Sequence, residues 1–595
     1  MDVRTPIPTN GGDWLPKFLD SWKAQVAQLK QKFGDSIEKT CLPPEYPTDV
    51  PIVYVSKAAV IDVLRFMKNE AGFEYDFLAD FTATDESIEP RFELVYNLFS
   101  TTKKCRFRLK IRVYEGEDVP TAIGVWQGAD WAEREIWDMY GVKFTGHPDL
   151  RRILMDERYQ GHPLRKDFPL RGYQVVTEPE LAQPKLLDYD PNDLSAAPQG
   201  ADPDDLWAGA RTIVNIGPNH PAMHGSFRLV AKLNGETIEK SYSEFGYTHR
   251  AKEKLGEYKT YHQYIVYTDR MNYVSALANN FTYAMAVEKL MGIQVTDRTT
   301  WIRMIACEIS RIIDHLVCIG INAVDLGAFT YFLYGYHQRE EAYTLIEKLC
   351  GARLTTSYCR IGGLSGDAPE GFEKELKAWV KKTREVVNEM DKLLTGNQIW
   401  HKRTRGVSVF NREQCLQYSF TGPSARAAGL DIDLRRDQPS MFYKDVQFDV
   451  PVAREGDIFA RYIVRLEEVR QSLNILAQCA DRLKPGPIWV EDKRVRIPEK
   501  DQVHNTMEGL IYHFKFFMTG FDVPEGEAYS QMETPNGELG FYIVSKGGPK
   551  AHRMRVRAPS FWHFQGLSPM IQGEKIADMV GALGSINIIA GELDR

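Results

Sequence analysis

The stretch RTTWIRMIACEISRIIDHLVCIG, residues 298–320, decides the fold of the larger part of this chain. Apolar residues recur in it at steps of three and four, at positions 302, 305, 309, 312, 316 and 319. This spacing places them on one face of an α-helix, which Thr296 or Asp297 can cap at its start. The sequence therefore predicts a long amphipathic helix that packs against other helices.

Similar helical patterns surround this stretch. They cover residues 274–291, ending at Gly292 as a C′ glycine, and then 338–350, 369–395, 456–482, 503–519 and 571–584. Short strands precede them at 212–217, 226–235 and 236–244, with Asn234-Gly235 as a hairpin turn, and strands return at 540–546 and 552–558. Residues 207–595 are therefore predicted to form a mainly α-helical bundle with small β elements.

Residues 1–170 are predicted to form a separate α+β domain. In CRFRLKIRVY, residues 105–114, apolar and basic residues alternate with a period of two. That period is typical of a half-buried strand, whose basic face is either solvated or covered by a partner. Residues 171–206 contain five prolines and little periodicity, so we interpret them as a linker between the two modules.

The amino-acid composition and the missing motifs exclude several classes of protein function. The chain has 595 residues, of which 43% are hydrophobic and 26% charged, and 74 basic against 81 acidic residues give a net charge of −7. These values are typical of a globular protein with several domains, and they argue against a nucleic-acid binder. The N-terminus lacks a secretory h-region, so a reducing cytoplasm is expected. None of the eight cysteines forms a C-x-x-C pair, and the P-loop and G-x-G-x-x-G motifs are absent, which excludes the standard metal, ATP and NAD sites.

Residues 316–336 are apolar and long enough to span a bilayer. Asp325 stands in the middle and Gly320 and Gly327 interrupt the run, so a buried core helix with its exit loop is the prediction. A lone carboxylate in such a run must be paired, neutralised or hydrogen-bonded. The alternative is that Asp325 merely caps the start of a helix.

Three motifs carry side chains suited to chemistry. GPNHPAMHG, residues 217–225, holds His220 and His224 on a stiff loop, either as proton donors and acceptors or as structural histidines. YTDRMNY, residues 267–273, ends in Tyr273 just before an apolar helix. GYTHRAKEKL, residues 246–255, contains Arg250 and is either a solvated face or a charged rim near a redox centre.

Together these motifs resemble a known family. EREIWDMYGVKFTGHPDLRRIL and GHPLRKDFPL (133–154 and 161–170) resemble the C subunit of bacterial NADH:quinone oxidoreductase, respiratory complex I. The three motifs above, together with RIGG (360–363), TGPSARAAGLDIDLR (421–435) and GELGFYIVSKGG (537–548), resemble the D subunit. The order C, linker, D resembles the fused C/D subunit of some bacteria. The resemblance implies a second module similar in fold to the large subunit of nickel–iron hydrogenases, with a cavity in place of the metal.

The resemblance also implies a function. The quinone headgroup contacts match His224 and Tyr273, Asp325 matches the acidic partner of that histidine, and Arg250 matches an arginine near the terminal iron–sulfur cluster. Quinone is then the substrate, this chain ligates no cofactor or metal, and partner subunits hold the iron–sulfur clusters and FMN.

The expected partners are the B, I and other peripheral-arm subunits and the membrane-arm H subunit, with no nucleic acid. The expected place is the cytoplasmic side of the inner membrane, where quinone reduction is coupled to proton translocation. Thr248 and Asn272 depart from the family, which commonly has an aliphatic and an acidic residue there. Two rival readings are a hydrogenase-type nickel enzyme, which the missing cysteine pairs oppose, and a non-catalytic assembly scaffold, which His224, Tyr273 and Asp325 oppose.

Overall fold

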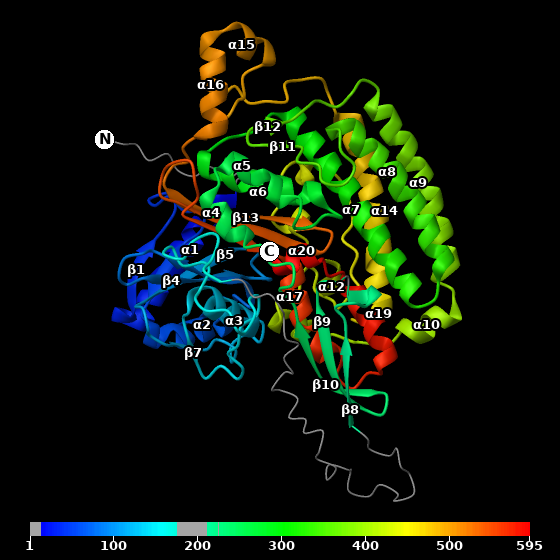
Figure 1. Ribbon diagram of the computed structural model, residues 1–595, viewed down its shortest axis with the longest axis horizontal. Coiled ribbons are helices and arrows are strands. Elements are labelled where there is room, and N and C mark those ends of the chain that lie inside the picture. Colours follow the sequence, from blue (N-terminus) through cyan, green and yellow to red (C-terminus); the bar gives the residue numbers. More distant parts are fainter. Residues whose placement is uncertain (1–13, 175–210, 224) are drawn as a thin grey trace, which may run out of the picture.

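A computed structural model describes residues 14–174, 211–223 and 225–595 (Figure 1). The predicted linker lies outside these ranges from residue 175 onward. The N-terminal region is built on a five-stranded sheet in the order β1-β2-β5-β4-β3, in which only β2 and β5 are parallel. Its elements are α1 (Trp14–Phe33), β1 (Ile37–Cys41), β2 (Ile52–Val55), α2 (Val60–Asn69), β3 (Phe77–Asp85), β4 (Phe92–Phe99), β5 (Arg106–Val113), β6 (Val119–Pro120), α3 (Ala129–Tyr140) and β7 (Phe144–Thr145).

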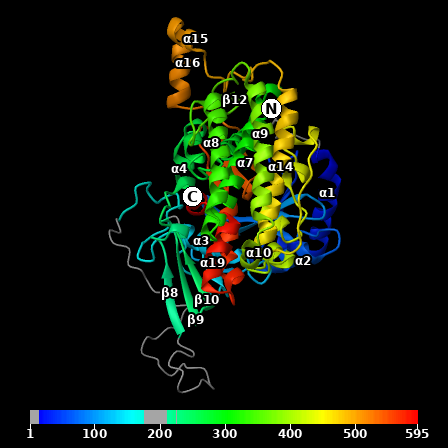
Figure 2. The same cartoon turned by 90° about the vertical axis from the view of Figure 1, so that its right-hand side faces the viewer.

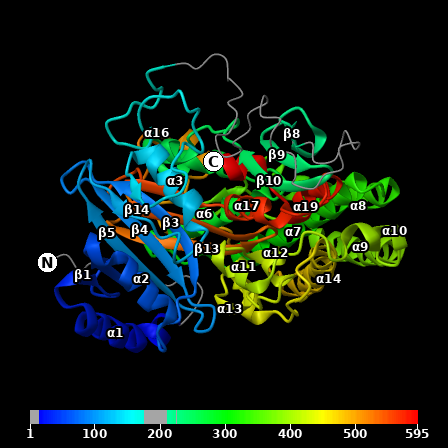
Figure 3. The same ribbon diagram turned by 90° about the horizontal axis from the view of Figure 1, so that it is seen from below.

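The predicted basic strand is β5, and its basic face is covered by another part of the same chain. Phe107, Leu109 and Ile111 face the core beneath α1 and α2. On the opposite face Arg108 and Lys110 are buried, and both pair with Glu527 of β13 (Gly526–Thr534), with N–O distances of 3.5 and 3.0 Å. Figure 3 shows β13 and β14 (Gly537–Ser545) running beside the N-terminal sheet. The solvated reading is therefore wrong for Arg108 and Lys110, and the segment that covers them belongs to the same chain rather than to a partner.

The second region is a helical bundle with small sheets at its edges. Four long helices, α7 (Asp297–Asp325), α8 (Phe329–Cys350), α9 (Phe372–Leu394) and α14 (Ile458–Arg482), form the bundle seen from its side in Figure 2. Helix α7 packs against α8 and α14, and α6 (Ala276–Met291) packs between α7 and β13. The mixed α and β content agrees with the predicted class.

Shorter elements frame the bundle. Strands β8 (Arg211–Ile216), β9 (Arg228–Asn234) and β10 (Thr237–Glu244) form one antiparallel sheet, and β13, β14 and β15 (Arg553–Arg557) form another. The remaining elements are α4 (Lys252–Tyr258), α5 (Tyr261–Thr268), β11 (Cys359–Arg360), β12 (Gly363–Leu364), α10 (Gln398–Thr404), α11 (Arg412–Gln417), α12 (Gly422–Arg426), α13 (Leu434–Asp437), α15 (Lys500–Asn505), α16 (Met507–Met518), α17 (Pro559–Gln565), α18 (Leu567–Ile571), α19 (Ile576–Ile586) and α20 (Ala590–Asp594).

The apolar stretch 316–336 contains the end of one helix and the start of the next, at positions that differ from those predicted. Helix α7 ends at Asp325 and α8 begins at Phe329, about nine residues before its predicted start. Phe329 and Leu333 are exposed although they are apolar, so no polar face marks the first turns of α8. Among the helices of the described residues, none combines the length and the apolar composition that a membrane span needs.

The N-terminal and bundle regions share one hydrophobic core. Trp131 of α3 packs against three rings from the second region, with centroid distances of 4.9 Å to Phe245, 5.7 Å to Phe561 and 5.8 Å to Phe564. The same cluster continues into α1, β3 and α19. Arg555 of β15 adds a buried ionic link between the regions, since it binds Asp80 of β3 at 2.9 Å.

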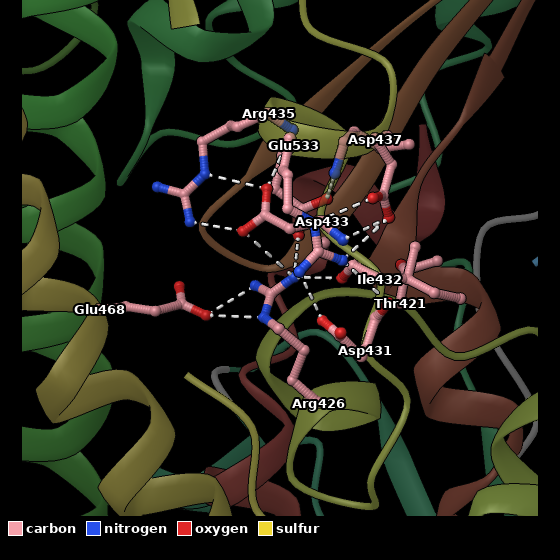
Figure 4. A network of polar contacts seen from close by, with 12 residues as sticks. Thr421, Arg426, Asp431, Ile432, Asp433, Arg435, Asp437, Glu468 and Glu533 are labelled. Carbon is pink, nitrogen blue, oxygen red and sulfur yellow. Dashed lines mark hydrogen bonds and ion pairs between the residues drawn. The ribbon is translucent and has the colours of Figure 1, made fainter. Parts of the chain in front are cut away.

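Buried ion pairs also fix α7 within the bundle. Figure 4 shows Arg426, which is fully buried between Glu468 of α14 and Glu533 of β13, with N–O distances of 2.6 and 2.8 Å. Glu468 also accepts a hydrogen bond from His315 of α7 at 2.9 Å. Burial by itself would raise the pKa of Glu468, but Arg426 and His315 hold it well below the ordinary value. This network sets the position of α7 against the motif at residues 421–435.

Candidate functional site

The candidate site lies along the line of contact between α7 and the segment of α19 and Asn587, which we call the α7–α19 seam. Three contacts join the two segments in order: Asn587 donates to Asp314 at 2.5 Å, Cys318 to the Gly584 carbonyl at 3.6 Å, and Asn322 to the Gly581 carbonyl at 3.3 Å. The α7 residues are four apart, so they lie on one helix face. Glycine favours this approach, because a Cβ on Gly584 would lie 3.2 Å from the Asn322 side chain, which would then have to shift.

The loop with the two predicted histidines packs against one end of this seam. Residues 221–223 form a short 3₁₀ helix that contacts α19. Gly217 has a φ of +86°, and a Cβ there would lie 2.6 Å from the Phe227 carbonyl oxygen, so only glycine fits. The Nδ1 atom of His220 accepts a hydrogen bond from the Ala222 N–H at 3.2 Å. His224 lies outside the described residues.

A cavity of about 690 Å³ opens beside this loop. Its lining comes from β8, the loop and the first half of α19, and consists of residues 214–220, 576, 577, 579 and 580. The α19 side of the cavity is apolar (Ile576, Ala577, Met579, Val580), whereas the loop side carries Asn215, Asn219 and His220. An apolar wall facing a few polar groups is the usual character of a small-molecule pocket.

Asp325 lies at the C-terminal end of α7, so the alternative in which it caps a helix start is wrong. It is also exposed in the chain, where a buried carboxylate was expected. Neighbouring protein atoms still desolvate its carboxyl group, and its pKa is raised to about 6 although the nearby His220 ring acts in the opposite direction. A carboxylate at a helix C-terminus is not favoured by the helix dipole, so this position is not explained by helix stability.

Tyr273 lies in the loop before α6, with 37% of its surface exposed. Its pKa is raised, first by burial of part of the ring and then by the negative charge of Asp314. Asp314 and Asp325 are eleven residues apart on α7, which places them on the same face and about 16 Å apart along the axis. Tyr273 therefore lies near one end of the seam, and Asp325 near the other.

The loop that carries Arg250 is anchored by hydrogen bonds to α20, and Arg250 itself is exposed. Asp594 of α20 accepts hydrogen bonds from the N–H groups of Gly246 and Thr248 at 3.0 and 2.7 Å. The Thr248 hydroxyl adds a third, at 2.6 Å, which gives this departure from the family a structural role. In α4, which follows, residues 252–254 are buried, so the solvated-face reading is wrong for them.

The second departure also contacts α20. Asn272 is fully buried, and its side chain donates to Glu592 at 3.1 Å and accepts from the Ser275 N–H at 2.9 Å. Burial raises the pKa of Glu592, while its bonds to Ser560 and Asn272 lower it. An acidic residue at position 272 would place a second carboxyl group against Glu592, so asparagine avoids a like-charge contact there.

No group of three or more His, Cys, Asp or Glu side chains suited to a metal occurs in the described part of the chain. Seven of the eight cysteines are buried, and burial raises the pKa of each of those seven thiols. Such thiols stay protonated at neutral pH, whereas a metal ligand must be a thiolate.

Comparisons with known proteins agree with this architecture. A model of the respiratory-chain NADH dehydrogenase 30 Kd subunit matches residues 53–174, and one of the 49 Kd subunit matches residues 325–595. The C/D subunit of NADH-quinone oxidoreductase from Bdellovibrio bacteriovorus is 43% identical over 545 residues, covering 91% of this chain and 95% of the relative.

The chain belongs to the NADH-quinone oxidoreductase C/D subunit family. C/D subunits of Azotobacter vinelandii and Pseudomonas fluorescens are 36% and 34% identical, and the alignments cover 98% and 99% of this chain. The recognition made from the motifs is therefore confirmed, and so is the assignment to an oxidoreductase complex.

The sequence analysis did not identify two acidic groups of this site, Asp314 and Glu592. Asp314 lies beside the apolar stripe of residues 298–320, and Glu592 lies within the final turn of the chain, between Gly591 and Leu593. The only available signal for Asp314 was an acidic residue flanked by Ile313 and His315 in a helix that is otherwise mainly apolar.

Proposed function

We propose that this chain forms a quinone-reduction site along the α7–α19 seam, with the headgroup held between Tyr273 and His224. The arrangement of two acidic groups along one face of α7 supports this most directly. The charge of Asp314 reaches Tyr273, and about 16 Å along the helix axis Asp325 lies within range of the histidine loop.

The chemistry asked of these groups is hydrogen bonding and proton donation. A Tyr273 pKa above the usual value of about 10 keeps the hydroxyl protonated at neutral pH. It gives up its proton only when negative charge builds on the bound oxygen. Asp325, with a pKa of about 6, is mostly ionised at pH 7 and favours the charged form of a paired histidine. A charged imidazole can then donate the second proton.

We also propose an electron donor, a set of partner subunits and a location for this chain. Electrons come one at a time from an iron–sulfur cluster in the neighbouring B subunit, and Arg250, which is exposed in this chain, is available to lie near that cluster. The chain docks with the I, H and other peripheral-arm subunits on the cytoplasmic side of the inner membrane, and quinone reduction is coupled to proton translocation. We propose further that the helical bundle has a fold similar to that of the hydrogenase large subunit. We also propose that the first domain ends at residue 170 and that the linker ends at residue 206.

Replacing Tyr273 by phenylalanine tests the function. The change removes one hydroxyl and keeps the ring, so we expect quinone reduction to fall by about 10²-fold, as for loss of a general acid. NADH oxidation with an artificial acceptor upstream should persist. The matched control is Tyr46→Phe, since Tyr46 is similarly exposed, at 38%, and lies in the N-terminal region. Unchanged quinone reduction in Tyr273→Phe complexes contradicts the proposed site.

Replacing Asp325 by asparagine tests the histidine pairing. We expect a loss of quinone reduction similar to that of His224→Ala, without loss of assembly. A double-mutant cycle with His224→Ala should show coupling of about 0.5–3 kcal/mol, and the same cycle with His220→Ala reveals whether the nearer described histidine is the partner instead. If Asp325 is only a surface residue at a helix end, the substitution leaves activity unchanged and stabilises the chain by about 0.3–1 kcal/mol.

A further inference from the structure

Lys252 is a buried lysine that joins two loops of the proposed site. It is the second residue after Arg250, and α4 begins with it. Only 8% of its surface is exposed. Its Nζ atom donates hydrogen bonds to the carbonyl oxygens of Arg270 and Gly591, at 3.0 and 3.1 Å. The side chain therefore links the loop of Arg250 directly to the loop that carries Tyr273 and to α20.

The tyrosine loop also packs closely against α20. A Cβ on Gly591 would lie 2.8 Å from the carbonyl oxygens of both Arg270 and Met271, so the loop would have to move if residue 591 had a side chain. Asn272 continues this contact, because its side chain donates to Glu592 at 3.1 Å. Each of the three residues before the tyrosine is thus held against α20.

The bonds of Lys252 are ones that an apolar side chain of similar volume cannot make. Burying an ammonium group is costly unless it is hydrogen-bonded or paired. Burial lowers the pKa of Lys252 to about 8, and the nearby carboxylates of Asp594 and Asp269 oppose that shift. The group is therefore mostly charged at pH 7, and a charged donor makes stronger hydrogen bonds than a neutral one. The ammonium group is a strong link between α4, the tyrosine loop and α20.

We propose that Lys252 is a positioning residue for Tyr273, which keeps the tyrosine loop at a fixed place relative to the loop of Arg250. This inference rests on the proposed quinone site. The role of Lys252 is indirect, since it fixes the Arg270 carbonyl, from which the chain reaches Tyr273 three residues later. A misplacement of about 1 Å in a group that holds a substrate can cost about 10²-fold in rate, so this fixing matters for donation of the tyrosine proton.

The substitution Lys252→Met in the complete complex tests this role. Methionine fills much of the buried volume but cannot donate to the two carbonyl oxygens. We expect quinone reduction to fall about tenfold, less than in Tyr273→Phe, because the hydroxyl is displaced and not removed. NADH oxidation with an artificial acceptor upstream should persist. Rates measured over a range of quinone concentrations should show the change in the same constant, kcat or KM, as Tyr273→Phe shows.

The matched control is Lys254→Met in the same helix. Lys254 is also buried, with 2% of its surface exposed, but its Nζ atom donates to the Arg165 carbonyl oxygen of the N-terminal region at 2.6 Å. Both substitutions remove a buried ammonium group from α4, so both should lower the denaturation midpoint of the chain. Only Lys252→Met should lower quinone reduction. An equal loss of quinone reduction in both variants overturns the positioning role, because the effect is then one of stability alone.

A double-mutant cycle separates positioning from a general weakening of the structure. If Lys252 acts through the tyrosine hydroxyl, Lys252→Met should cost less than about twofold in rate once Tyr273→Phe is present, because the group that it positions is gone. Independent effects would instead multiply. The same loss in both backgrounds overturns the inference.

The substitution Gly591→Ala keeps the inference testable if Lys252→Met does not assemble. The added methyl group pushes the Arg270 carbonyl away from α20 while Lys252 stays intact. Quinone reduction should fall as in Lys252→Met, and again only when Tyr273 is present; an unchanged rate in Gly591→Ala overturns the inference. If Tyr273→Phe is impaired while Lys252→Met and Gly591→Ala are normal, only this inference fails. If Tyr273→Phe is fully active, the proposed site itself fails.

Discussion

Replacing Arg426 by methionine is expected to lower the free energy of unfolding by about 3–5 kcal/mol. The guanidinium is fully buried and contacts Glu468 and Glu533 directly, with Asp433 at 3.7 Å. Methionine fills much of the volume but leaves these carboxylates without their shared positive charge. A complete buried ionic network stabilises the folded state little more than an apolar core of the same volume would. Removing one of its charges is nevertheless strongly destabilising, because the remaining charges are buried without a partner and cannot reach water.

The matched control is Arg436→Met in the same segment. Arg436 pairs with Asp431 and Asp437 at 2.8 and 3.0 Å, but 41% of its side chain is exposed. Exposed pairs contribute about 0–1 kcal/mol, so this variant should unfold nearly as the wild type does. Denaturant titrations of the two variants measure the difference. Equal losses in both would show that burial of the Arg426 network does not determine its strength.

The Arg426 network should also make the chain sensitive to acid. The pKa of Glu468 in the folded chain is well below its ordinary value. A carboxyl group with a depressed pKa contributes stability above its unfolded pKa of about 4.3, and this contribution is lost as the pH falls through the folded value. The difference between wild type and Arg426→Met should therefore shrink at strongly acidic pH.

Replacing Arg555 by methionine is expected to separate the N-terminal region from the bundle. Arg555 contacts three carboxylates, Asp80 of β3 at 2.9 Å, Glu135 of α3 at 2.5 Å and Glu253 of α4 at 3.4 Å. All four groups are buried. Without the guanidinium, Asp80 loses the arginine it binds, while Glu135 keeps Arg595 and Glu253 keeps Arg553. Leaving a buried charge without its partner costs about 3–5 kcal/mol.

A protease site inserted between residues 184 and 198 makes this loss measurable. After cleavage, the two wild-type pieces should stay together on a sizing column, and the Arg555→Met pieces should elute separately. Arg112→Met is the control, since Arg112 lies on β5 with 41% of its side chain exposed and makes one longer contact, 3.5 Å to Glu93. Co-elution of the Arg555→Met pieces contradicts the expected role of this arginine.

The sequence predicted those parts of the fold that depend on local periodicity. Helix α7 begins where Thr296 was expected to cap it, with the Thr296 side chain accepting from the Thr299 N–H, and Gly292 ends α6 in a left-handed conformation. The alternation of β5 with one basic face was also predicted, whereas its cover by β13 of the same chain was not. These features follow from spacing, capping and alternation within about twenty residues.

Long-range burial could not be predicted in the same way. Glu308 and Arg311 occupy the polar face of α7, which periodicity assigns to solvent, yet both are buried among charges from other segments. The helix was predicted to cover residues 298–320, but α7 passes through Gly320 and continues to Asp325, and the break falls at Gly327 instead. The five-residue helix α20 is too short to show a period, although its acids hold two of the site loops.

The core that Trp131 shares with Phe245, Phe561 and Phe564 has a consequence for how the protein behaves on dilution. Two separate polypeptides meet with a rate that falls with their concentration, and they part when diluted below their dissociation constant. Here both surfaces belong to one chain, so their encounter is unimolecular and does not depend on the concentration of the protein. Equal numbers of the two regions are made at every translation, and each finds its own counterpart at any cellular abundance.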